Sequence, residues 1–207
     1  SKYLNAIQAI DAERRLARVE PGVICDQLKD QAAKVGLTFG PDPATHSRCT
    51  LGGMIGNNSC GAHSVMAGKT VENIHRLEVL TYDGQRFWVG PTDEQAYQEH
   101  LAAGGRRAEI VKALKDLVER YEADIREGFP TLKRRVSGYN LDQLLPENGF
   151  NIARALVGVE GTCVTVLQAE TLLVKNPTHR VLVLLGYDDI FLAADSVPQL
   201  LPLEPIA

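Results

Sequence analysis

The feature of this sequence that most constrains its fold is a stretch from Ala44 to Thr70 that is rich in Gly, Asn, Ser and Thr and has no sustained hydrophobic period. Structureless segments of this length are uncommon inside compact domains and are usually functional. Four glycines fall between Cys49 and Gly61. Because glycine adopts positive φ and has no side chain, such a segment can approach a ligand and present N–H groups to its oxygens. The sequence therefore predicts a ligand-binding loop made largely of main chain.

The polar side chains of this stretch are neutral. The residues suited to hydrogen-bonding a polar ring edge, a ribose or a diphosphate are Thr50, Asn57, Asn58, Ser59 and Ser64. Two interpretations stay open on this pattern alone, namely a site for a nucleotide-like ligand and a glycine-rich loop with a structural role only.

Two common nucleotide signatures are missing. No G-x-G-x-x-G follows a predicted strand. Gly68-Lys69-Thr70 imitates the end of a P-loop, but His63 occupies the position of the first glycine of that motif. The sequence therefore argues against a Rossmann NAD site and against a P-loop.

The segments around the glycine-rich stretch indicate an α+β fold with mostly antiparallel strands. Asp83-Gly84 between two apolar runs is a strong hairpin signal, and Gly36 is a helix stop. The predicted elements are a strand over 16–20, a helix over 23–35, an extended piece over 37–40, a hairpin over 74–82 and 85–89, helices over 92–103 and 107–122, β-rich runs over 163–174 and 180–187, and a helix from 189 to about 197.

The composition limits the class of partner. The formal net charge is -4 and the pI is about 5.7, so neither nucleic acid nor an anionic membrane is favoured. The longest apolar runs are far shorter than the roughly 20 residues that cross a bilayer. The four cysteines contain no CxxC and the histidines no HxH or HExxH spacing, so no metal site is expected. We expect a cytoplasmic protein.

Several short blocks occur in a fixed order from residue 15 to about residue 175. They are Val19-Glu20-Pro21-Gly22-Val23, Gly40–Pro43, Thr50–Asn58, Gly68-Lys69-Thr70, Leu77-Glu78-Val79 with Asp83-Gly84, and Gly158–Thr162. Together they resemble the PCMH-type (FAD-binding type 2) domain of vanillyl-alcohol-oxidase-like flavoproteins, and most of all that of D-lactate, glycolate and D-2-hydroxyglutarate dehydrogenases. The resemblance implies an α+β domain whose mostly antiparallel sheet is flanked by helices.

The resemblance also implies non-covalent binding of FAD by three segments. The residues that correspond to the diphosphate and flavin-ring segment are Pro41, Asp42, Pro43, Thr50, Leu51, Gly52 and Gly53. Those that continue around the cofactor are Asn57, Asn58, Ser59, Gly61 and Ser64, and those beside the adenosine part are Glu160, Gly161 and Thr162. Val136–Leu141 resembles a motif that leads towards the substrate, which makes Arg135 and Tyr139 candidate substrate contacts.

The same resemblance predicts how the chain is divided. Residues 1–175 are expected to form a partial FAD-binding domain with a helical insertion at about 92–150, and residues 176–207 to begin a truncated substrate or cap domain. The Arg-Gly-x-Gly-Thr-Ser loop that family members carry earlier in the chain is not found in this sequence. We therefore expect the N-terminal diphosphate-loop subdomain to be missing, the chain to be a fragment of a longer enzyme, and the catalytic residues to lie outside it.

The activity implied is FAD-dependent oxidation of a 2-hydroxy acid to the 2-oxo acid. Electrons are expected to pass to a quinone, a cytochrome or an iron–sulfur domain, and any iron–sulfur cluster would belong to a domain not present here. A homodimer, and peripheral attachment of the full enzyme to the inner membrane, are compatible with this interpretation. No transmembrane segment is expected.

Two other classes of function stay open. The chain could be a folded scaffold or interaction module that binds no cofactor as isolated. It could also be a cysteine hydrolase with Cys60 as nucleophile and His63 as base, which requires an activating base held by a third group. Covalent flavin attachment through Cys60 or His63 is a weaker alternative, because the order of residues supplies no sign of it.

Overall fold

The centre of the fold is a five-stranded antiparallel sheet with strand order β1-β2-β6-β4-β5. The structure is a computed structural model that describes residues 2–207. The strands are β1 (Ile7–Asp11), β2 (Leu16–Val19), β4 (Ile74–Thr81), β5 (Arg86–Val89) and β6 (Val164–Leu172). The α+β class and the mostly antiparallel sheet predicted from the sequence are therefore confirmed.

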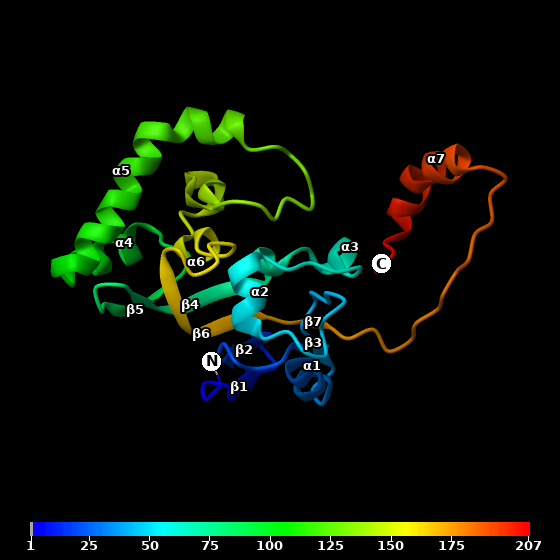
Figure 1. The fold of residues 1–207 in the computed structure, drawn as a ribbon, viewed down its shortest axis with the longest axis horizontal. Helices are drawn as coiled ribbons and strands as arrows, with labels where there is room; N and C mark the ends of the chain where they lie inside the picture. Colours follow the sequence, from blue (N-terminus) through cyan, green and yellow to red (C-terminus); the bar gives the residue numbers. More distant parts are fainter. Residues whose placement is uncertain (1) are drawn as a thin grey trace.

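Helices and a second, smaller sheet surround this sheet (Figure 1). The smaller sheet pairs β3 (Leu37–Thr38) with β7 (Val174–Lys175). The α-helices are α1 (Cys25–Ala33), α2 (Leu51–Asn57), α3 (Ser64–Ala67), α4 (Glu94–Ala102), α5 (Gly105–Gly128), α6 (Ile152–Ala155) and α7 (Ile190–Leu200). Short 3-10 turns are η1 (Thr70–Asn73), η2 (Leu141–Leu144), η3 (Pro146–Asn148) and η4 (Leu201–Leu203).

The two faces of the central sheet differ because side chains alternate along each strand. Leu77 pairs with Val89 and faces the core, whereas the neighbouring pair Glu78 and Trp88 points to the opposite face. The core face is covered by helices, and the opposite face carries charged side chains. The fold therefore offers one apolar and one charged surface on the same strands.

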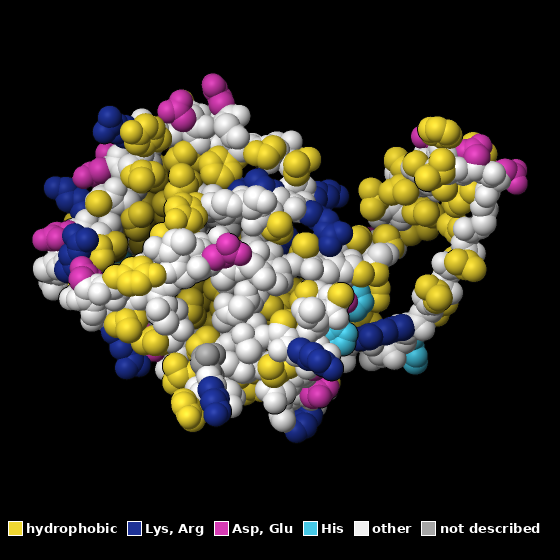
Figure 2. Space-filling model, in the orientation of Figure 1, with side chains coloured by type: hydrophobic (Ala, Val, Ile, Leu, Met, Phe, Trp, Pro, Cys, Tyr) yellow, Lys and Arg dark blue, Asp and Glu magenta, His cyan; other side chains and the backbone are white. Residues whose placement is uncertain are grey.

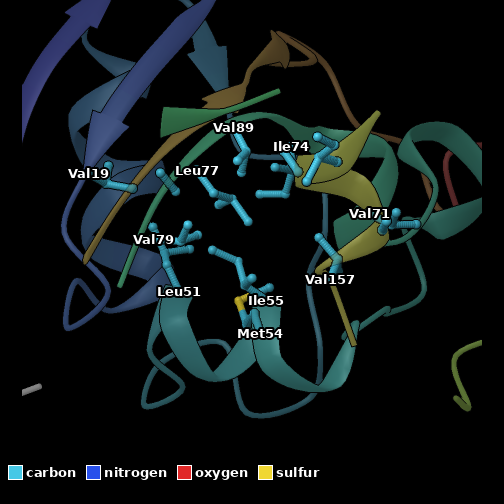
Figure 3. Close-up of a cluster of buried hydrophobic side chains, with 14 of the residues drawn as sticks. Val19, Leu51, Met54, Ile55, Val71, Ile74, Leu77, Val79, Val89 and Val157 are labelled. Atoms are coloured by element: carbon cyan, nitrogen blue, oxygen red, sulfur yellow. The ribbon is translucent and has the colours of Figure 1, made fainter. Parts of the chain in front are cut away.

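Helix α2 lies across the core face of the sheet. Its side chains Leu51, Met54 and Ile55 recur at helical spacing and are at most 2% exposed. They point towards the strands, where they meet Leu77 and Val79 of β4 (Figure 3). Because three buried apolar side chains fix this short helix, its glycines are held in position against the sheet.

Most of the predicted elements are present. The hairpin is found with its turn at Asp83-Gly84, where Gly84 has φ +86°. The predicted helix over 23–35 is α1, and it ends before Gly36 at φ +73°. The two predicted helices over 92–103 and 107–122 are α4 and α5, and the helix from 189 is α7.

The expectation that 44–70 lacks regular structure is wrong, because α2 and α3 lie within it. Three of the seven residues of α2 are glycine, which lowers intrinsic helix propensity. Burial of its apolar face, and the Thr50 Oγ1 that accepts the Gly53 N–H at 3.2 Å as an N-cap, outweigh that cost. The helix ends at Asn58 in the left-handed conformation, with φ +53°.

The predicted β-rich run over 180–187 is also wrong, because these residues form no strand. A strand needs a neighbour to satisfy its N–H and C=O groups, and no strand of residues 2–207 lies beside this run. The strand β1 was not predicted at all. It forms because β2 offers it an edge, which local sequence cannot reveal.

Residues 176–207 loop out from the rest of the chain, and the C-terminal end returns towards α3, where Ile206 and Met66 line the same pocket (Figure 1). An extended linker leads to α7, which contains no buried residue. Leu182 and Leu184 in the linker are 91% and 92% exposed. The α7 lobe presents a nearly continuous hydrophobic surface (Figure 2). None of the helices within residues 2–207 has the length and apolar composition needed to span a membrane.

Candidate functional site

A groove of about 310 Å³ lies between α2, the segment 156–161 and the start of β6. We call it the glycine groove. Its lining residues are Pro21, Thr50, Gly52, Gly53, Ile55, Gly56, Leu156, Val159, Gly161, Val164, Thr165 and Val166. Two of the three predicted cofactor segments, separated by more than 100 residues in sequence, therefore meet on one surface.

The first wall of the glycine groove is the start of α2, which is fastened to the turn that follows β2. The Leu51 N–H donates to Val23 O and the Gly52 N–H to Pro21 O, both at 2.8 Å. With the Gly53 N–H capped by Thr50, the first-turn amides of α2 are occupied inside the protein. Any ligand therefore meets the surface of this turn rather than a row of free helix-terminal donors.

The second wall is the segment after α6. The Gly158 N–H donates to Ile55 O at 2.8 Å and the Glu160 N–H to Gly56 O at 2.9 Å, which ties this segment to the end of α2. Glu160 and Gly161 both have positive φ, +48° and +76°. The Thr162 Oγ1 closes the turn by donating to Val159 O at 2.6 Å. The Gly161 N–H makes no hydrogen bond within residues 2–207 and is a free donor at the groove.

The glycines of α2 have different surroundings. A Cβ on Gly52 would lie 2.6 Å from Pro21 Cβ and 2.9 Å from Pro21 O, so this residue must stay small for α2 to pack. A Cβ on Gly53 would meet only Thr50 Oγ1, at 3.3 Å, and Gly53 is exposed. The missing side chain of Gly53 thus opens the groove without serving the packing of the protein.

The glycine groove has no charged lining residue. Its polar groups are main-chain atoms and the hydroxyls of Thr50 and Thr165, and aliphatic side chains form the rest. This chemistry suits a flat ring or sugar with a polar edge, which fits the neutral donors and acceptors expected from the sequence.

The remaining predicted cofactor residues lie elsewhere. Asp42 accepts the His63 N–H and contacts His63 Nδ1, both at 2.9 Å. A Cβ on Gly61 would lie 2.0 Å from Asp42 O, so the two segments are in tight contact. The members of this second group are Pro41, Asp42, Pro43, Gly61 and Ser64. None of them lines the glycine groove.

Asn57, Asn58 and Ser59 connect the two groups. Asn57 is exposed and its Oδ1 accepts a hydrogen bond from Ser59 Oγ at 2.5 Å. Asn58 is fully buried, and its Oδ1 accepts the Val71 N–H at 3.0 Å. Its Nδ2 is a buried side-chain nitrogen with no partner within residues 2–207. Asn58 therefore acts in the structure as a packing residue at the end of α2.

The two candidate substrate residues lie on the loop between α5 and η2. Arg135 pairs with Asp142 at 2.6 Å, and its guanidinium stacks on Phe129 at 4.5 Å. Tyr139 is 46% exposed, and its hydroxyl is 2.7 Å from Thr162 Oγ1. Tyr139 thus lies beside the second wall of the groove, while the charge of Arg135 is used inside the protein.

Cys60 and His63 do not form a hydrogen-bonded pair within residues 2–207. His63 is held by Asp42, and the Cys60 Sγ instead lies 3.4 Å from an Arg134 nitrogen. Burial raises the pKa of the Cys25 thiol to about 12, which makes it unreactive. The structure gives no support to the cysteine-hydrolase alternative.

Among residues 2–207, no group of three or more His, Cys, Asp or Glu side chains is placed to hold a metal ion.

Sequence reasoning missed the far wall of the glycine groove. Val164, Thr165 and Val166 at the start of β6 complete it, together with Leu156 and Val159. The alternation over 163–174 indicated the strand, but only the pairing of β6 with β4 brings its first residues next to α2. Pro21 and Gly56 lay within the family blocks, yet nothing local marked them as groove residues.

Comparison with known proteins agrees with this geometry. Residues 1–90 match a family described as FAD binding domain. The chain is 32% identical to D-2-hydroxyglutarate dehydrogenase of Pseudomonas putida over 100% of this chain and 21% of that protein. It is 28% identical to D-2-hydroxyglutarate dehydrogenase of Escherichia coli over 96% of this chain and 20% of that protein. The chain therefore spans about a fifth of the length of these relatives.

Other relatives carry related names. The glycolate oxidase subunit GlcD of Bacillus subtilis is 27% identical over 97% of this chain and 32% of that protein. Among solved structures, alkyldihydroxyacetonephosphate synthase matches with a TM-score of 0.53 and 17% identity over 86% of this chain and 25% of that one. At this identity the structural match concerns the fold alone.

Proposed function

We propose that the glycine groove holds part of FAD, the cofactor indicated by the FAD binding domain family that residues 1–90 match, in an enzyme that oxidises a 2-hydroxy acid to the 2-oxo acid. The observation that carries the proposal is the meeting of Thr50–Gly56 and Val159–Val166 on one uncharged surface. The relatives named D-2-hydroxyglutarate dehydrogenase and glycolate oxidase support this substrate class.

The residues present fit part of an FAD molecule. The groove is at the small end of the 300–1,000 Å³ typical of ligand pockets, so it suits one portion of a long cofactor. Gly53 lines the groove without a side chain, which is the arrangement expected where a ligand approaches the main chain closely. The aliphatic walls match a ring face, and Thr50, Thr165 and the Gly161 N–H match its polar edge.

In this proposal the residues of the chain bind and orient the cofactor. FAD, when bound, supplies the redox chemistry. Thr50 and the amide of Gly161 fix the position of the cofactor by hydrogen bonds, and Val164 and Val166 exclude water from one side of it. The turn at Glu160 and Gly161 is held by Thr162, so the free Gly161 donor is oriented before binding.

The second group of predicted residues extends the proposed site. Asp42 holds His63 and packs on Gly61, which fixes the loop that follows α2. We include Pro41–Pro43, Asn57–Ser59, Gly61 and Ser64 in the proposal as the surface along which the rest of the cofactor would lie. The substrate roles of Arg135 and Tyr139 stay predictions, as does the electron acceptor.

The test is retention of FAD by the purified chain. We expect visible flavin absorbance to stay with the protein after excess FAD is removed by gel filtration. The methyl group added by Gly53→Ala would lie 3.3 Å from Thr50 Oγ1, so this side chain must shift slightly, while alanine improves helix propensity. The variant should therefore fold. It should weaken FAD binding by about tenfold or more, the usual consequence of overpacking a fitted contact.

Gly128→Ala is the matched control. Gly128 ends α5, has no atom within 4 Å of a built Cβ and does not line the groove. It should retain FAD like the parent chain. Equal binding by Gly53→Ala and Gly128→Ala would reject the groove, and a colourless parent chain would favour the cofactor-free scaffold.

We further propose the division expected from the sequence, with residues 1–175 as a partial FAD-binding domain that carries a helical insertion at about 92–150. In this proposal residues 176–207 begin the next domain. The support is the exposure of apolar side chains in this segment, such as Leu184 at 92% and Phe191 at 78%. Limited proteolysis should cut between Pro177 and Asp188 before any site within 1–175, and preferential cleavage elsewhere would contradict the division.

A further inference from the structure

A second pocket, of about 670 Å³, lies at the β5 edge of the sheet, where α4 and α5 pass the hairpin. We call it the arginine pocket. Arg76 and Trp88 contribute from the charged face of the sheet, and Phe87, His100 and Arg107 from the side of α4 and α5. The proposed function uses none of these residues, and no residue is shared with the glycine groove.

Two arginines of this pocket have no carboxylate partner among the residues that the structure describes. Arg76 stacks on Trp88, with its guanidinium carbon 5.5 Å from the ring centroid, and Arg107 stacks on Phe87 at 5.4 Å. Within residues 2–207 neither forms an ion pair at 4.0 Å or less. Each guanidinium is therefore held by an aromatic ring while its charge stays available to a ligand.

His100 is a third donor in the same pocket. It is 6% exposed, and its Nδ1 accepts a hydrogen bond from Arg107 Nε at 2.8 Å. Burial, and then the charge of Arg107, lower the pKa of His100. The ring is thus neutral with its proton on Nε2. Within residues 2–207, Nε2 has no hydrogen-bond partner. It is not among the fully buried unpaired atoms, so a ligand in the pocket can reach it.

The carboxylates nearby do not cancel these donors. Glu78 is engaged by Arg86 through two hydrogen bonds, at 2.8 and 3.0 Å. Glu99 is exposed at the rim and accepts a hydrogen bond from Gln95. Glu170, which lies opposite Arg76 on β6, is held by Arg18 at 2.5 Å. The pocket is therefore lined by two carboxylates, Glu78 and Glu99, of which Glu78 is already paired, and it also contains two arginines without an ion pair within residues 2–207 and a buried N–H donor.

The position of Arg76 depends on a glycine. A Cβ on Gly90 would lie 2.9 Å from Arg76 Cγ and 3.6 Å from its Cδ. The absence of a side chain at this position lets the arginine lie flat across the strand next to Trp88. Two aromatic supports and one glycine thus hold the cations in place before any ligand arrives, which reduces the entropic cost of binding.

We propose that the arginine pocket binds a small molecule through an oxyanion, either a carboxylate or a phosphate. Arg76 and Arg107 provide charge-assisted hydrogen bonds, and His100 Nε2 provides a neutral one. The volume leaves room for a molecule larger than the anion itself. This inference does not depend on FAD binding, because it uses a separate pocket.

The test uses fluorescence, because Trp88 is the sole tryptophan of the chain. Inorganic phosphate and succinate are titrated separately into the full chain at constant ionic strength, while Trp88 emission and heat of binding are recorded. We expect a saturable change with at least one of them. Preference between the two probes distinguishes phosphate from carboxylate as the natural group.

Arg76→Gln and Arg107→Gln should each weaken the binding by about tenfold or more, as loss of a charge-assisted hydrogen bond does. Arg120→Gln is the matched control, because Arg120 also lies on α5 and stacks on an aromatic ring, that of Tyr121 at 5.2 Å. Arg76 is exposed, so Arg76→Gln stays informative if Arg107→Gln fails to fold. The proposal is overturned by a linear, non-saturable response to both probes, or by equal weakening in all three variants.

Discussion

The glycine groove and the arginine pocket lie on the same sheet but are built from different groups. The groove is uncharged, and main-chain atoms, two hydroxyls and aliphatic side chains form its surface. The pocket is made of long charged and aromatic side chains at an edge strand. The groove is attached to the hydrophobic core through α2, whereas the cations of the pocket rest on the surface of aromatic rings.

This difference predicts how tightly binding and folding are linked in each region. Truncation of a buried α2 side chain beneath the groove removes contacts of the core, so it should lower both the stability of the protein and its affinity for the cofactor. At the exposed edge of the pocket, loss of the Arg76 charge, which forms no ion pair within residues 2–207, should alter binding with little effect on stability. Substitutions in the two regions, and one in the loop that follows α2, can therefore be used to test the comparison. Four are described from the largest expected effect to the smallest.

The largest effect is expected for Ile55→Ala. Ile55 is 2% exposed and lies between the glycine groove and the core. Its truncation should lower the free energy of unfolding by about 2–5 kcal/mol, because a cavity is left where α2 meets the sheet. Urea denaturation measures this loss. Val65→Ala on the exposed face of α3 is the control and should cost less than about 0.5 kcal/mol. Equal losses would show that α2 does not depend on the core.

A smaller effect is expected for Gly61→Ala, in the loop that follows α2. The added Cβ would lie 2.0 Å from Asp42 O and 2.3 Å from its carbonyl carbon, so one of the two backbones must move. The expected loss is about 1–3 kcal/mol in thermal or urea unfolding. Gly128→Ala should lose nothing, since its Cβ has no neighbour within 4 Å. A neutral Gly61→Ala would mean that the Asp42 segment is free to shift.

The sequence was informative where local pattern decides the structure. Asp83-Gly84 determined the hairpin, and Gly36 marked the end of α1. The family blocks predicted that Thr50–Gly53 and Glu160–Thr162 bind the same cofactor. In the structure, Gly53 and Gly161 line one groove. The roles of these residues towards FAD are part of the proposed function.

Other features could not be predicted because they depend on contacts distant in sequence. The helix α2 contains three glycines and forms because Leu51, Met54 and Ile55 are buried against the sheet. The strand expected over 180–187 is absent because no strand lies beside it in residues 2–207. The arginine pocket was not predicted either, since its residues come from four elements and follow no motif.

Acid should affect the region of the arginine pocket more than the groove. Burial lowers the pKa of His100 and of His75, and Arg107 and Arg76 contribute to the shift of His100 while Glu99 opposes it. At pH values between these lowered pKa values and the usual value of 6.5, the unfolded chain binds more protons than the folded chain. Stability therefore falls as the pH drops below 6.5. We expect a lower thermal midpoint at about pH 5.5 than at about pH 7.5.

His100→Gln tests this acid response, because the glutamine oxygen can still accept from Arg107. The difference between the two midpoints should shrink in this variant and stay unchanged in His179→Gln, which alters an exposed histidine. Arg126 lowers the pKa of Glu147 to about 2, so the ionised Glu147 stabilises the fold above pH 4.5. This stabilisation is lost only as the pH falls towards 2. Glu147 therefore does not affect the change in stability between about pH 7.5 and about pH 5.5. If the difference between the two thermal midpoints is unchanged in His100→Gln, other groups cause the acid response.

The smallest effect on stability is expected for Arg76→Gln, although its effect on oxyanion binding should be large. Arg76 is exposed and has no ion pair within residues 2–207, and its closest described side-chain interaction is with the ring of Trp88. The free energy of unfolding should stay within about 0.5 kcal/mol of the parent chain, by urea denaturation. Trp88 emission should shift, because one of the two guanidinium groups over its ring is removed and only that of Arg18 remains. If this variant loses as much stability as Gly61→Ala, the cations of the pocket are part of the fold, and the contrast with the groove fails.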